Sequence, residues 1–163
     1  MKKKILILAG GFSKEREISL KTAKAVNLEL KKKKYKTIIC EPNGKLISRI
    51  NKFRPDIVFN ALHGRYGEDG YIQSLLENEK VKYTHSGPLA SSIAIDKEIS
   101  KKIFIKNKIL TPKYIKFIFE KKINKKKIIT KVQNKIGFPA VIKPFNEGSS
   151  VNVYICTKYN FIK

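Results

Sequence analysis

Two glycine-containing segments of this sequence carry ionisable side chains directly after apolar runs. Gly10 and Gly11 follow the apolar run at residues 5–9, and Glu15 comes shortly after them. A turn from a buried strand into a helix directs backbone N–H groups and the positive helix end toward a ligand. Glu15 could therefore hold a substrate ammonium group, or it could only favour the helix dipole, and this segment leaves both roles open.

The second segment, residues 63–70, follows the apolar run at residues 57–62 and contains three glycines and His63. Three glycines in so short a stretch give the backbone freedom rather than packing. A single histidine is often structural, but one in a glycine-rich loop at the ligand end of a strand is a candidate for binding. The loop predicts a site at the carboxyl edge of a parallel sheet, where such folds bind ligands.

A lysine and a loop of small residues near the end of the chain suggest a phosphate site. Lys143 ends the apolar run at residues 140–142 and precedes Pro144, a position where a lysine commonly binds phosphate. The backbone N–H groups and hydroxyls of the next loop could surround phosphate oxygens. That loop lacks the Gly-Lys-Ser/Thr of a P-loop, and a plain hairpin turn is the alternative. Its residues include Glu147, Gly148, Ser149 and Ser150.

The elements that must position these residues alternate between strands and helices, which predicts a parallel α/β sheet. Ser13 is expected to cap a helix that runs to about Lys33, and its apolar residues should pack on the sheet. Those apolar residues are Ile18, Ala25, Val26 and Leu30. Strands are expected at residues 5–9, 36–40, 57–62 and 81–84, and a further helix at 69–78.

The pattern changes near residue 93, which predicts an N-terminal domain at 1–93 and the start of a second domain at 94–163. A helix at residues 95–107 should be followed by a strand at 112–119 and, after a lysine-rich linker, by a helix ending near Ile136. The strands expected at 140–143 and 151–156 should pair antiparallel around the loop between them. These few elements cannot close a core, so the second domain is expected to be incomplete.

The composition limits the class of protein. The 163 residues carry 36 Lys plus Arg against 13 Asp plus Glu, a formal charge of +23. Such a charge suits a nucleic-acid or anionic-membrane partner, but the lysines are spread along the chain and arginine is scarce, which favours solvated lysines. Cys40 and Cys156 are far apart and predict buried free thiols rather than a zinc site. No apolar run approaches a membrane span or a signal sequence, so a cytoplasmic protein is expected.

Four stretches, in this order, resemble the D-alanine–D-alanine ligase family. Each stretch alone is modest evidence, but together they span nearly the whole chain. They are AGGFSKEREISL at residues 9–20, NALHGRYGEDGYIQSLLE at 60–77, YTHSGPLASSIAIDKEISK at 83–101 and GFPAVIKPFNEGSSV at 137–151.

The resemblance implies an N-terminal Rossmann-like parallel sheet followed by an ATP-grasp domain. It implies an enzyme in which ATP phosphorylates the carboxylate of one D-alanine and the amine of a second attacks the acyl phosphate. The products are D-alanyl-D-alanine, for peptidoglycan precursors, with ADP and phosphate. The family also implies Mg²⁺ or Mn²⁺, and a homodimer formed through the N-terminal domain.

The family's roles can be carried over by motif. Glu15 would bind the ammonium of the first D-alanine, and His63 would lie beside its carboxylate, with Gly64 and Gly67 letting the loop approach it. Ser149 would belong to the hydrogen-bonded group that positions Glu15. The residues that would contact ATP are Lys97, Lys143, Glu147, Gly148 and Ser150.

This chain lacks the family's metal ligands, since residues 148–163 contain neither Asp nor Glu. Family members continue well beyond this length, so the chain is expected to be incomplete and inactive alone, with the metal ligands elsewhere. Two alternatives are another ATP-grasp ligase, such as one that joins D-alanine to D-lactate, and a basic nucleic-acid-binding module. Tyr66 and Asn152 also differ from the family's usual smaller residue and glycine.

Overall fold

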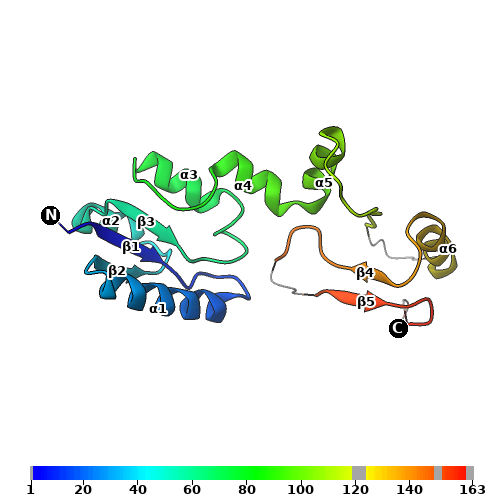
Figure 1. Ribbon diagram of the computed structural model, residues 1–163, viewed down its shortest axis with the longest axis horizontal. Coiled ribbons are helices and arrows are strands. Elements are labelled where there is room, and N and C mark those ends of the chain that lie inside the picture. The colour runs from blue at the N-terminus through cyan, green and yellow to red at the C-terminus, as the bar shows by residue number, and fades with distance from the viewer. Residues whose placement is uncertain (1, 119–123, 149–151, 161–163) are drawn as a thin grey trace. The chain divides into compact units, whose positions relative to one another are not determined.

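The computed structural model describes residues 2–118, 124–148 and 152–160 of the chain (Figure 1). It divides into two compact units, Met1–Ile95 and Asp96–Lys163. The division lies next to the boundary that the sequence suggests, at the step between two helices.

The first unit is built on three parallel strands. β1 (Lys4–Leu8) lies between β2 (Lys36–Cys40) and β3 (Ile57–Asn60) in the order β2-β1-β3. The registers run without a break, with Leu6 opposite Ile38 on one side and Val58 on the other. The predicted parallel α/β sheet is confirmed, and all three strands end at the same edge.

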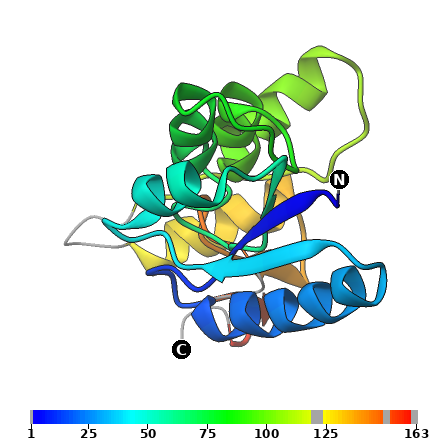
Figure 2. The same ribbon diagram turned by 90° about the vertical axis from the view of Figure 1, so that its left-hand side faces the viewer.

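Helices cover both faces of this sheet (Figure 2). α1 (Arg16–Lys32) packs on one face, against Ile5 and Ile7. α2 (Leu46–Phe53) and α3 (Tyr71–Asn78) pack on the other. Because side chains alternate along a strand, β1 supplies apolar groups to both cores. Leu6, Ile7 and Leu8 are fully buried, which explains why β1 is apolar without interruption.

The face that α1 buries differs from the predicted one. Val26 and Leu30 pack toward the sheet as expected, but Ile18 and Ala25 are exposed. Ser19 and Ala23 occupy the buried face instead. A polar serine can lie there because its hydroxyl accepts a hydrogen bond from the Gly10 N–H at 2.8 Å. A buried face chosen from apolar residues alone was therefore partly wrong, because it left out Ser19.

Several boundaries in the first unit are corrected. β3 ends at Asn60 rather than at residue 62. The strand expected at 81–84 is reduced to one parallel bridge between Val58 and Tyr83. α2 is amphipathic but was not predicted, and it is only eight residues long. The helix expected at 69–78 begins at Tyr71, after Gly70 adopts a φ of +94°.

The helix expected at 95–107 is confirmed as α5 (Lys97–Lys106), and a helix that was not predicted, α4 (Pro88–Ile95), precedes it. Asp96 separates them with an extended backbone. Its carboxylate accepts hydrogen bonds from the N–H groups of Glu98 and Ile99 at 2.8 and 3.0 Å. This N-cap satisfies two donors that a helix start otherwise leaves unpaired.

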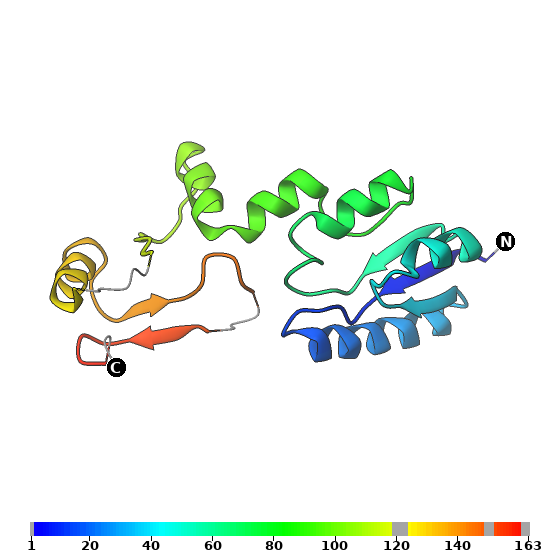
Figure 3. The ribbon, with the colours of Figure 1, turned by 180° about the vertical axis from the view of Figure 1, so that it is seen from behind.

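The second unit contains a helix and a hairpin in its later part (Figure 3). α6 (Lys125–Lys135) precedes β4 (Ala140–Ile142), and β4 pairs antiparallel with β5 (Tyr154–Cys156), which confirms the expected pairing. The strand expected at 112–119 is wrong over residues 112–118, where the backbone adopts no strand. The two lysines there are three residues apart, which is not the two-residue alternation of a half-buried strand.

Candidate functional site

The loop after β1 begins the site at the carboxyl edge of the sheet. Gly10 and Gly11 have φ angles of +84° and +83°, a region that side chains with a Cβ rarely adopt. The Ala9 N–H donates to the Cys40 carbonyl at 3.0 Å, which holds the start of this loop beside the end of β2. The loop then turns across the sheet edge toward α1, as its strand-to-helix position predicts.

Ser13 links this loop to the one after β3. Its hydroxyl donates to the His63 carbonyl oxygen at 2.8 Å and accepts from the Glu15 N–H at 3.1 Å. The expectation that Ser13 caps the helix is wrong, since α1 begins at Arg16 and Ser13 lies one turn earlier. Its role between two loops has no signal in the sequence, because the two loops are far apart along the chain.

The structure brings Glu15 and Gly64 together. Glu15 is buried, with 4% of its surface exposed. A Cβ built on Gly64 would lie 3.7 Å from the Glu15 carboxyl carbon and 3.5 Å from the Ser13 Cβ. The backbone of Gly64 thus lies close to the carboxylate, and its φ of +66° is what favours glycine at this position. A buried carboxylate at a ligand-binding edge is suited to an ammonium group, because opposite charges attract more strongly where water is largely excluded.

The His63 imidazole lies between an acid and a hydroxyl. Its Nδ1 is 3.5 Å from Oε1 of Glu68, and its Nε2 is 3.4 Å from the Thr22 hydroxyl. The other oxygen of Glu68 accepts from the Gly64 N–H at 2.9 Å. The Glu68 carboxylate favours a hydrogen on Nδ1, which leaves Nε2 toward Thr22. Sequence analysis missed both neighbours: Glu68 stands within the quoted loop motif, and Thr22 looks like an ordinary helix residue.

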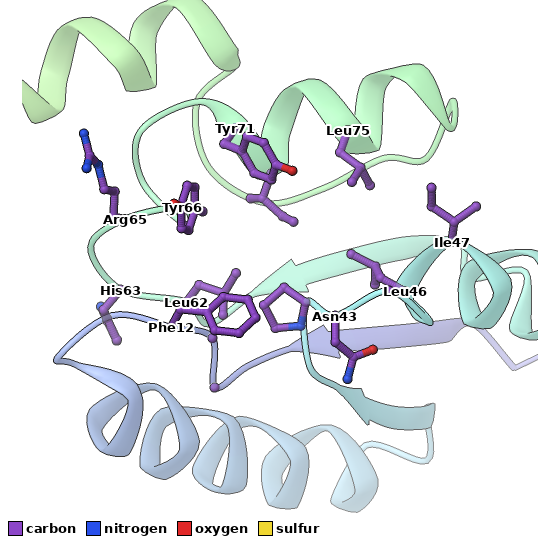
Figure 4. Close-up of a pocket in the computed structure, with 16 residues that line it drawn as sticks. Phe12, Asn43, Leu46, Ile47, Leu62, His63, Arg65, Tyr66, Tyr71 and Leu75 are labelled. Atoms are coloured by element: carbon purple, nitrogen blue, oxygen red, sulfur yellow. The ribbon is translucent and has the colours of Figure 1, made fainter.

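An apolar pocket of about 690 Å³ adjoins these loops (Figure 4). It is lined by residues of the loops that follow all three strands, such as Phe12, Pro42, Leu62 and Tyr66, and by Tyr71 of α3. The rings of Tyr66 and Tyr71 meet edge to face, with centroids 5.1 Å apart. His63 also lines the pocket.

The phosphate candidates belong to the second unit. The Lys97 N–H donates to the Phe145 carbonyl at 2.8 Å, and its ammonium group donates to the Glu147 carbonyl oxygen. Burial lowers the pKa of Lys97, and the nearby charge of Lys143 lowers it further, while Asp96 and Glu147 act in the opposite direction. The structure therefore brings Lys97 and Lys143 close enough to repel, and two adjacent ammonium groups favour an anion.

The loop that follows Lys143 is only partly described. The carboxylate of Glu147 accepts from the Asn152 side chain at 3.3 Å, so it has a partner within the loop. Gly148 is the last described residue before the gap. Ser149 and Ser150, to which the resemblance gives roles, lie outside the described residues.

Within the described residues, no group of three or more His, Cys, Asp or Glu side chains lies together as a metal site would require. Cys40 and Cys156 are buried free thiols, as expected. No helix in the described part of the chain has the length and apolar character needed to span a membrane.

Two family models match the chain. The D-ala D-ala ligase N-terminus matches residues 40–86, and the D-ala D-ala ligase C-terminus matches residues 103–163. The first match contains the loop with His63, and the second contains Lys143 and the loop after it.

Known proteins agree with these matches. The chain is 63% identical over its whole length to the D-alanine–D-alanine ligase of Pelagibacter ubique, of which it covers 53%. It is 48% identical to that of Wolbachia pipientis, over 93% of this chain and 46% of the relative. The crystal structure of the Bacillus anthracis ligase is similar with a TM-score of 0.75 and 35% identity, over 95% of this chain and 49% of that one.

The same Bacillus anthracis ligase in complex with ATP is similar with a TM-score of 0.74 and 33% identity. That match covers 96% of this chain and 49% of the other. The chain thus spans about half the length of the curated relatives and solved structures that it matches.

Proposed function

We propose, because this chain belongs to the D-alanine–D-alanine ligase family, that it carries the first-substrate and phosphate-binding parts of an ATP-dependent ligase that joins two D-alanines. The observation that carries the proposal is the buried Glu15 carboxylate against Gly64, in the same group of loops as His63. A carboxylate and an imidazole are the two groups needed to hold both ends of a small amino acid.

The first unit would bind the first D-alanine. The Glu15 carboxylate would pair with the substrate ammonium, and His63 would lie beside the substrate carboxylate. The Thr22 hydroxyl at Nε2 and the Glu68 carboxylate at Nδ1 limit the rotation of the imidazole. Such positioning raises the rate because it places the carboxylate where it can be phosphorylated.

The second unit would bind the ATP phosphates through Lys97 and Lys143. The neighbouring ammonium groups repel one another in the free chain, and an anion between them would relieve that repulsion. Glu147 and Gly148 would contribute the loop beside them, since the Glu147 carbonyl holds the Lys97 ammonium in place. We extend the same proposal to Ser150 as a phosphate contact and to Ser149 as a group that positions Glu15.

The remaining parts of the proposal concern the metal, the assembly and the compartment. Magnesium or manganese would need carboxylate ligands, and residues 148–163 contain neither Asp nor Glu, so this segment would not supply them. We also propose a homodimer formed through the first unit, and the cytoplasm as the compartment. A nucleic-acid-binding role is not favoured, because the similar proteins described above are ligases.

An ADP-release assay tests the proposed reaction on the product of the complete reading frame, with ATP and D-alanine as substrates. ADP release that depends on D-alanine, with D-alanyl-D-alanine as the product, is the expected result. Glu15→Gln should reduce kcat/KM for D-alanine at least about 100-fold, since it removes the partner of a buried ammonium. Ser91→Ala, which removes a buried hydroxyl of α4, is the matched control and should change kcat/KM less than about threefold.

D-lactate added as a competing acceptor tests the alternative of a ligase that joins D-alanine to D-lactate. A dominant D-alanyl-D-lactate product would replace the proposed substrate pair while keeping the reaction type. ADP release that does not respond to D-alanine at all would overturn the proposed function.

A further inference from the structure

Two buried amide side chains donate hydrogen bonds to one backbone carbonyl of the site loop. Asn60, at the end of β3, donates from Nδ2 to the Gly67 oxygen at 2.8 Å. Gln73, on α3, donates from Nε2 to the same oxygen, also at 2.8 Å. Both side chains are almost fully enclosed, with 3% and 1% of their surfaces exposed. The loop is therefore held from the strand before it and from the helix after it.

The two amides differ in how well they are satisfied. The oxygen of Asn60 accepts from the Leu62 N–H at 3.1 Å, so this side chain uses both ends of its amide. The Gln73 Oε1 is buried and has no hydrogen-bond partner within the described residues. An unpaired buried acceptor lowers stability, and an apolar side chain of similar length would avoid that cost. What the Gln73 amide provides in return is its hydrogen bond to Gly67.

The clamped carbonyl belongs to the peptide group that joins Gly67 to Glu68. The N–H of the same peptide, on Glu68, donates to the Gly64 oxygen at 2.9 Å. Both ends of this peptide plane are thus held, which fixes the direction in which Glu68 leaves the backbone. The Glu68 carboxylate then meets the Gly64 N–H and the His63 imidazole.

Close packing at Gly67 also restricts the position of the loop. A Cβ built on Gly67 would lie 2.3 Å from the Leu62 Cβ, so the peptide is in close contact with the chain that precedes His63. A shift of the Gly67 peptide would have to move Leu62 or lose the hydrogen bond to Gly64. The geometry connects α3 to His63 through one peptide group and one carboxylate.

We propose that Gln73 is a positioning residue for the first substrate: its amide holds the Gly67–Glu68 peptide so that Glu68 sets the His63 imidazole and the Gly64 N–H. The inference rests on the proposed function for its substrate, D-alanine. Gln73 acts through other residues and touches no reacting atom. Asn60 holds the same carbonyl oxygen from β3, and Gln73 adds a second constraint from α3.

The experiment compares the 163-residue chain with its Gln73→Met variant, which keeps the side chain's length and removes both the donor and the unpaired acceptor. NMR would record the Gly64 and Glu68 amide signals, the ¹⁵N shifts of the His63 ring, and a titration with D-alanine. The expected result is an unchanged or higher unfolding midpoint, shifted His63 and Gly64 signals, and at least a tenfold weaker D-alanine affinity. A residue with only a structural role would change the midpoint and leave these signals in place.

Ser91→Ala is the matched control, because Ser91 also donates from a buried side chain to a backbone carbonyl, that of Ser86. It should leave the His63 signals and the D-alanine affinity as they are in the parent chain. Unchanged His63 and Gly64 signals in Gln73→Met would overturn the inference.

Gln73→Glu provides a second variant if Gln73→Met does not fold. Its neutral carboxyl group can donate to the Gly67 carbonyl, whereas the ionised group cannot. The His63 and Gly64 signals should match the parent at low pH and depart from it as the carboxyl ionises. Signals that follow the parent at every pH would contradict the inference. If the parent chain fails to bind D-alanine, the proposed substrate fails, while the loop signals still decide the role of Gln73.

Discussion

The two units differ in how far their described residues enclose their own apolar side chains. In the first unit, Leu6, Ile7 and Leu8 of β1 are fully buried between helices on both faces of the sheet. In the second unit the hairpin buries Ala140 and Cys156, while Val141 and Ile155 are exposed by 58% and 73%. The first unit therefore supports its binding loops from its own core. The second holds its lysines on elements with one uncovered apolar face, a feature typical of a surface that packs against something else.

The largest expected effect comes from matched truncations in the two units. Leu8→Ala should lower the free energy of unfolding by about 2–5 kcal/mol, because it leaves a cavity in a closed core. Ile155→Ala, which removes an exposed side chain of the hairpin, should change it by less than about 0.5 kcal/mol. Urea denaturation followed by circular dichroism measures both. Equal losses would show that the hairpin is enclosed in solution and would remove the contrast between the units.

Glycines in the two units provide the next comparison. Gly67→Ala should destabilise the chain by about 1–3 kcal/mol, since the new methyl group would lie 2.3 Å from the Leu62 Cβ. Gly137→Ala meets no atom within 4 Å but has a φ of +90°, so only backbone strain of about 1 kcal/mol is expected. Gly44→Ala, with open space and no positive φ, is the neutral control. A larger loss for Gly137→Ala than for Gly67→Ala would contradict the packing argument for the site loop.

The sequence predicted most elements of both units, and the errors have a physical reason. A doubly covered strand such as β1 needs an uninterrupted apolar run, which is visible in the sequence. The segment at 112–118 also contains apolar residues but adopts no strand, and sequence patterns do not reveal whether a strand would have a partner. A polar residue in the core causes the opposite error, because a polar residue is expected to be exposed, whereas Ser19 of α1 is buried.

The same limit applies to the site. Glu15, His63 and Gly64 could be predicted because they lie in glycine-rich loops at strand ends and in motifs that resemble the family. Ser13 and Gln73 could not, because their roles depend on hydrogen bonds to the backbone of other segments. A side chain that binds a backbone carbonyl leaves no residue pattern at the position it binds.

A third pair of substitutions tests backbone strain in exposed turns. His85 has a φ of +85°, beyond the small left-handed region open to ordinary side chains, whereas Lys108 lies within it at +57°. His85→Gly should raise the free energy of unfolding by about 1 kcal/mol, because glycine adopts this φ without a clash. Lys108→Gly should give less than half that gain. A loss of stability in His85→Gly would mean that the contact of its ring with the Thr84 hydroxyl outweighs the strain.

Alkaline pH should affect the first unit through Tyr83. Burial, followed by its hydrogen bond to Glu77, raises the pKa of Tyr83 from 10.0 to about 12. The unfolded chain then loses this proton at lower pH than the folded chain, so the contribution to stability is complete below pH 10 and is lost between about pH 10 and 12. Tyr83→Phe should flatten the fall in stability over that range, as measured by urea midpoints at successive pH values. An equally steep fall in the variant would assign the alkaline loss to other groups.

The second unit should respond to alkaline pH in the opposite direction through Lys97. Burial, and then the charge of Lys143, lowers the pKa of Lys97 below 10.5. The folded chain therefore loses this proton at lower pH than the unfolded chain, so the free energy of unfolding rises as the pH increases toward 10.5. Burial is the larger cause, so Lys143→Met should return the pKa of Lys97 only part of the way to 10.5. NMR of the Lys97 side chain measures this, and Lys102, whose pKa is raised by its hydrogen bond to Glu98, is the internal control.

Inorganic triphosphate should raise the pKa of Lys97 in the parent chain more than in Lys143→Met, since an anion offsets the repulsion between two ammonium groups only when both are present. An equal rise in both chains would mean that Lys97 and Lys143 do not share one phosphate site.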